Sequence, residues 1–195
     1  MTTTIIQNIF KFLVFLTIWT FNGNFSQCQD FTAGDIITLK VQDFSLIDTN
    51  HAPISMNLTA AIPGQPVQDV TNSDMFVKIS SIVPGNTNRE ITARIAAGTV
   101  PLGTNLSLIS AESTTTNSGG RLGIPVTTPI ILSDVDQVLV SEIGSCYTGT
   151  GYNDGYQLTF TWGPDGPEVN YHMIEATEEP VTITIVFTIT AHDGN

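Results

Sequence analysis

Basic residues are scarce in this chain of 195 residues. Six Lys and Arg stand against 18 Asp and Glu, which gives a formal net charge of −12 at pH 7. An acidic chain repels phosphate backbones, so we expect no nucleic-acid partner. We interpret most of the negative charge as a means of keeping the protein soluble.

Long hydrophobic runs are also missing, apart from one short run near the N-terminus. Lys11 precedes the largely apolar stretch 12–21, and a small and polar run reaches Gln27. This order predicts a secretory signal peptide over residues 1–28, cleaved after Cys28. The apolar core is much shorter than the roughly 20 residues that span a bilayer, so we expect no stable membrane span after cleavage. The pattern predicts an extracellular or cell-surface protein, with the periplasm and the outer membrane as alternatives.

Cysteine is rare, with only Cys28 and Cys146. If Cys28 leaves with the signal peptide, no disulfide forms within the chain. The alternatives are that Cys28 is acylated, as in a lipoprotein, or is bridged to Cys146. The remaining residues 29–195 are enough for one domain with its own core, so we expect a single domain that needs no disulfide.

The residues that most often build metal and catalytic sites are few and scattered. The three histidines, His51, His172 and His192, fall in different segments, whereas a structural zinc site needs about four clustered ligands. Asn153-Asp154-Gly155 could supply oxygen ligands to calcium, but the same triplet is typical of a turn. Cys146 has no histidine at a spacing that indicates a catalytic pair. We therefore predict no catalytic residues, no metal and no cofactor.

Helical periodicity is absent after the predicted signal peptide, and period-2 alternation replaces it. In Val181–Thr190, apolar residues occupy every second position and threonines most of the others. β-branched residues in this pattern suit a pleated, half-buried surface. Further strands are predicted over 36–41, 44–47, 55–62, 75–82, 89–95, 105–110, 137–141 and 156–162. Short strands separated by frequent Gly and Pro turns predict an all-β protein, an antiparallel β-sandwich, with a closed barrel as the alternative.

Aromatic residues make up only 8% of the chain, but several gather between Tyr147 and Tyr171. Exposed rings stack on sugars, so loops 148–155 and 163–167 are candidates for a glycan-binding site. Tyr152, Asp154 and Trp162 are the residues that we expect to contact such a ligand.

Three segments resemble exported, mostly uncharacterised β-sandwich proteins of Bacteroidota. They are 89–104, 143–151 followed by 155–160, and the closing strand 181–190. The general plan also resembles small immunoglobulin-like subunits of pilin type, such as spore-coat-U-like and chaperone–usher subunits. The first resemblance implies a fold and export more than an activity, and the second implies assembly of copies at the cell surface.

The strand Val181–Thr190 carries no charge. Natural edge strands usually carry charges, prolines or bulges that prevent pairing with another chain. Such a strand is therefore either central in its sheet or pairs with another chain. The second alternative predicts a non-enzymatic structural or adhesive protein that self-associates or binds other surface proteins, with 35–47 as the donor strand. A secreted glycan-binding module is the alternative function.

Overall fold

The computed structural model describes residues 36–59, 62–85, 87–113, 116–166 and 170–192. The predicted signal peptide and Cys28 lie outside these residues. The chain divides into two units, Met1–Lys40 and Val41–Asn195. The described residues of the first unit, 36–40, form no regular secondary structure. In the described part of the chain, no helix has the length and apolar character needed to cross a membrane.

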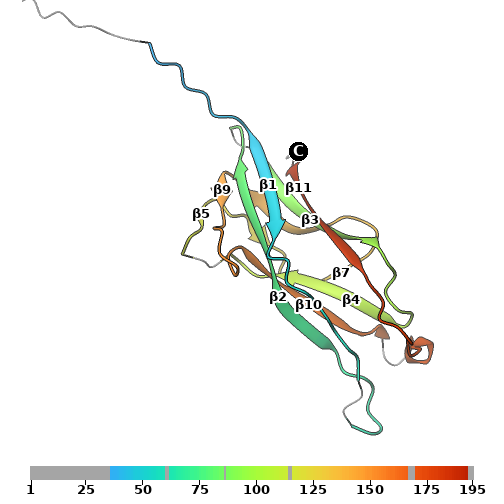
Figure 1. Cartoon of the computed structure of the whole chain (residues 1–195). Helices are drawn as coiled ribbons and strands as arrows, with labels where there is room; N and C mark the ends of the chain where they lie inside the picture. The colour runs from blue at the N-terminus through green and yellow to red at the C-terminus, as the bar shows by residue number, and fades with distance from the viewer. Residues whose placement is uncertain (1–35, 60–61, 86, 114–115, 167–169, 193–195) are drawn as a thin grey trace, which may run out of the picture. The chain divides into compact units, whose positions relative to one another are not determined.

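The second unit consists of two antiparallel sheets, which confirms the predicted all-β sandwich (Figure 1). The seven-stranded sheet has the order β5-β9-β2-β10-β4-β7, with β1 also paired to β2, and the four-stranded sheet has the order β11-β3-β8-β6. The strands are β1 (Phe44–Thr49), β2 (Val70–Ile82), β3 (Asn88–Ala97), β4 (Thr104–Ser110), β5 (Gly119–Gly120), β6 (Ile124–Pro125), β7 (Ile130–Ile131), β8 (Gln137–Ile143), β9 (Cys146–Tyr147), β10 (Tyr156–Pro164) and β11 (Thr184–His192). A single turn of 3-10 helix, η2 (Tyr171–Met173), precedes β11.

The core lies between the two sheets and draws on both. The long central strands β2, β3 and β10 show the period-2 burial that their sequences predict. Leu108 and Leu158 of the seven-stranded sheet and Ile91 and Ile143 of the four-stranded sheet are 0% exposed. Because the two sheets share no strand, the structure is a sandwich and not the closed barrel that the sequence left open.

Two predicted strands are wrong in the described residues. Segment 52–59 keeps alternating burial, and Ile54 and Met56 pack against the core, but its backbone joins no ladder. His51, with φ +52°, and Pro53 turn the chain after β1. Segment 36–41, in turn, has no partner strand. Alternation of side chains makes a strand only where a neighbouring backbone accepts its hydrogen bonds.

Candidate functional site

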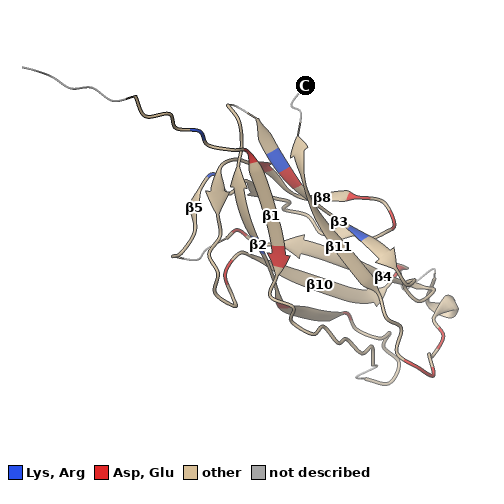
Figure 2. Ribbon diagram, turned by 45° about the horizontal axis from the view of Figure 1, so that its top comes forward, with Lys and Arg blue, Asp and Glu red and all other residues tan. Residues whose placement is uncertain are grey.

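The free edge of β11 is the most unusual feature of the sandwich. Among the described strands, β11 pairs only with β3, from Thr184 opposite Ala97 to His192 opposite Asn88. The strand has nine residues and no Asp, Glu, Lys or Arg, and Figure 2 shows it without charge. The strand that the sequence left as either central or edge is therefore an edge strand, and one side of its backbone pairs with no described strand.

The other edge strands lack such a surface. β5, β6 and β7, which end the sheets elsewhere, have only two residues each. β6 ends in Pro125, which has no N–H to donate. β1 is longer, at six residues, but carries Asp48. Short strands, prolines and charges are the usual protection against edge-to-edge pairing, and β11 has none of them. Its ladder with β3 has one irregularity, between Thr184 and Ile185 at the start of the strand.

The inward face of β11 is incompletely covered. Ile189 and Phe187 pack against the core and stand opposite Ile91 and Ala93 of β3. Ile91 and Ala93 are 0% exposed, whereas every described side chain of β11 retains some exposure. β1 contacts β11 but shares no ladder with it (Figure 1). The apolar face of β11 is therefore only partly covered in the described structure.

Segment 36–41 is the most exposed apolar stretch among the described residues. Ile37 is 80% exposed and Leu39 is 88% exposed, and Ile36 and Val41 are similarly open to solvent. Ile37, Leu39 and Val41 lie at alternate positions, so an extended backbone would place them on one face. Phe44–Ile47 belongs to β1 and already pairs with β2, so the predicted donor 35–47 narrows to the residues before β1.

The structure does not gather the three predicted glycan contacts into one site. Tyr152 is 61% exposed in the loop before β10. Asp154 lies in the same loop but is buried, and its Oδ2 accepts a hydrogen bond from the Gly151 N–H at 2.7 Å. Trp162 lies towards the other end of β10, packs against the core and donates from Nε1 to Thr104 Oγ1 at 3.0 Å. Of the three side chains, that of Tyr152 is the most exposed.

Tyr152 lines a pocket that sequence reasoning missed. Its volume is about 340 Å³, and residues from three segments surround it: Ala52, Pro53, Ser73, Asp74, Phe76, Tyr152, Asn153 and Gln157. β2 and β10 bring two of them together, since Gln157 stands opposite Phe76 in the ladder. No sequence pattern signals this pocket, because its residues come from positions about 100 apart that only strand pairing unites.

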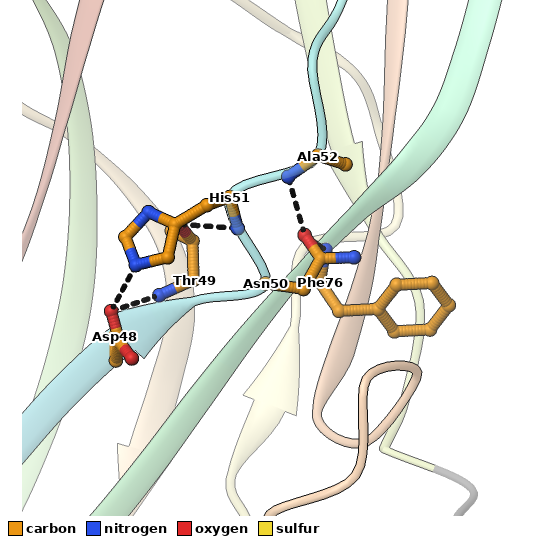
Figure 3. Close-up of polar contacts among 6 residues, drawn as sticks. All are labelled: Asp48, Thr49, Asn50, His51, Ala52 and Phe76. Carbon is orange, nitrogen blue, oxygen red and sulfur yellow. Dashed lines mark hydrogen bonds and ion pairs between the residues drawn. The ribbon is translucent and has the colours of Figure 1, made fainter.

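A buried asparagine, Asn50, links two segments that line the pocket, and Figure 3 shows its contacts with Ala52 and Phe76. Asn50 follows β1, and its Oδ1 accepts hydrogen bonds from the N–H groups of Phe76 at 3.1 Å and Ala52 at 3.3 Å. Its Nδ2 donates to the Asp74 carbonyl at 2.7 Å. The side chain therefore replaces backbone pairing where the chain turns away from β2, and it holds Ala52 beside that strand.

The histidines and carboxylates remain dispersed. His51 pairs with Asp48 at 3.2 Å and His192 pairs with Glu90 at 3.1 Å, both near the surface. Within the described ranges, no group of three or more His, Cys, Asp and Glu side chains could hold a metal ion.

Cys146 is a free, buried thiol on β9, as the sequence predicts for a small apolar residue. Burial raises its pKa from 9.0 to about 11. Burial, together with the neighbouring Cys146, also raises the pKa of Tyr156, whose hydroxyl donates to the Leu122 carbonyl. A protonated thiol is a poor nucleophile at neutral pH, so we expect slow alkylation of Cys146 in the folded protein.

The raised pKa of Cys146 also predicts a loss of stability in alkali. Between pH 9 and about 11 the unfolded thiol ionises while the folded thiol keeps its proton. The unfolded state then binds fewer protons, so the free energy of unfolding falls as pH rises, by about 2 kcal/mol for this group. Urea unfolding at about pH 8 and about pH 10.5 measures the effect. The Cys146→Ala variant should show a smaller fall, and an equal fall would contradict the assignment to Cys146.

Comparisons with known proteins give no relative from which a function could be transferred. No protein-family model matches the chain, and neither a curated protein nor a solved structure matches it significantly.

Proposed function

We propose that the protein is an exported, non-enzymatic structural or adhesive component of the cell surface, whose copies join by strand pairing into a fibre. The order of charge and apolar residues before residue 28 supports export. The observation that carries the proposal is the unpaired, uncharged edge of β11 beside a half-covered apolar face.

The occupant that we propose for this edge is segment 36–41 of a second copy. An added strand gains backbone hydrogen bonds along the edge, and its alternate side chains enter the apolar layer. Residues 36–41 can supply both the backbone hydrogen bonds and the apolar side chains. Ile37, Leu39 and Val41 would share one face and are exposed before assembly. At about 3.3 Å per residue, the segment spans roughly 20 Å, which fits within the nine residues of β11.

Deleting residues 29–41 tests the proposal. We expect the unaltered protein, with its mature N-terminus measured by mass spectrometry, to form oligomers or fibres. We expect the deleted form to be a folded monomer, because 36–40 contribute nothing to the described core. Size-exclusion chromatography with light scattering and negative-stain electron microscopy report the states. An unaltered protein that stays monomeric at high concentration would refute strand-mediated assembly.

A further inference from the structure

The pocket beside Tyr152 has the dimensions of a small ligand site. Its volume of about 340 Å³ lies at the lower end of the range of ligand pockets, which is about 300–1,000 Å³. The segments that contain Ala52 and Phe76 are held together, because the Asn50 side chain accepts hydrogen bonds from the backbone N–H groups of both residues. The site is therefore formed without a ligand.

Two aromatic rings contribute to its walls. Tyr152 is 61% exposed, and its hydroxyl has no hydrogen-bond partner among the described residues. Phe76 is half-buried and lies opposite Gln157 in the ladder. The face of an aromatic ring is electron-rich and attracts the weakly positive C–H groups of a sugar ring. The exposed ring of Tyr152 can therefore stack against the ring of a pyranose.

Polar groups with spare bonding capacity stand next to these rings. Oδ2 of Asp74 accepts from Asn72 at 2.9 Å, which leaves its Oδ1 available. Gln157 donates from Nε2 to the Ser73 carbonyl at 3.0 Å, which leaves its Oε1 available. These two acceptors match the hydroxyl donors of a sugar, and the amide of Asn153 supplies both donor and acceptor groups.

We propose that this pocket binds one neutral pyranose unit of a glycan, stacked on Tyr152 and hydrogen-bonded to Asp74 and Gln157. The Asp74 carboxylate and the net charge of −12 disfavour anionic sugars such as sialic acid. The inference concerns the outer surface of β2 and β10 and does not depend on the pairing of β11.

Titration of the isotopically labelled protein with methyl glycosides, followed by NMR, tests the inference. The probes are methyl glycosides of glucose, galactose, mannose, N-acetylglucosamine and, as the anionic comparison, sialic acid. We expect at least one neutral glycoside to shift the backbone amides of Ser73, Asn153 and Gln157, and the sialoside to leave them unchanged. Tyr152→Ala should weaken binding about tenfold, whereas Tyr152→Phe should retain it because the ring remains.

Tyr147→Ala is the matched control. Tyr147 is 55% exposed on β9 and does not line the pocket, so its loss should leave sugar binding unchanged. If Tyr147→Ala and Tyr152→Ala weaken sugar binding equally, the assignment of Tyr152 as the stacking residue is overturned. An absence of amide shifts with every neutral glycoside, or shifts of the same size with the sialoside, would overturn the site itself.

Discussion

Leu39→Asp is expected to abolish self-association while leaving the fold intact. Leu39 is 88% exposed in the described structure, so the change removes no core contact. In the proposed assembly the same side chain is buried against β11. Burying a leucine contributes about 1.5–3 kcal/mol to the free energy of association, and the variant loses this contribution. Desolvating the new carboxylate at the interface weakens association further. At about 1.4 kcal/mol per factor of ten, the dissociation constant should rise at least about 100-fold.

Thr38→Asp is the matched control for this experiment. It adds the same charge one residue earlier, on the opposite face of an extended segment. We expect this variant to assemble like the unaltered protein, with sedimentation velocity as the measurement and the urea midpoint as the check on folding. Equal loss of assembly in both variants would indicate that charge, and not the apolar face of the segment, controls association.

Gly155→Ala is expected to cause a large loss of stability through a single added methyl group. Gly155 precedes β10 with φ +103°, and a Cβ at this position would lie 2.1 Å from the Val77 carbonyl oxygen. Backbone strain alone costs about 1–3 kcal/mol, and relief of the clash must separate β10 from β2. We expect a total of about 3–5 kcal/mol, measured by urea unfolding with Trp162 fluorescence.

Gly64→Ala separates the cost of backbone strain from the cost of the steric clash. Gly64 also has a positive φ, +86°, but no atom lies within 4 Å of its would-be Cβ. Its replacement should therefore cost only the backbone strain, about 1–2 kcal/mol. If Gly155→Ala costs no more than Gly64→Ala, then β2 accommodates the methyl group by a small shift and the close approach to Val77 is unimportant.

The sequence predicted the strands of the core well because burial on one face imposes period-2 alternation. It placed strands close to β2, β3, β4, β8, β10 and β11, and the structure confirms them. It failed at 36–41 and 55–59, where the same alternation lacks a ladder partner. Alternation reports which side chains meet an apolar surface, but it does not report whether a neighbouring backbone is present.

The candidate sites were less predictable than the fold. Tyr152 was predicted from its type and its place in a loop, and it lines the pocket, whereas Asp154 and Trp162 are engaged within the sandwich. Asp74 and Gln157 were missed because nothing in their local sequence distinguishes them from other polar residues on strands. Their proximity arises from the pairing of β2 with β10.

By itself, the sequence determined that the chain forms β-strands and which of their faces are apolar. Only the tertiary structure decided that β11 lies at an edge and that its apolar face is partly open. The reason is physical: side-chain pattern is a local property, whereas strand order depends on hydrogen bonds between segments far apart in the chain. The same long-range pairing places Tyr152, Asp74 and Gln157 around one pocket.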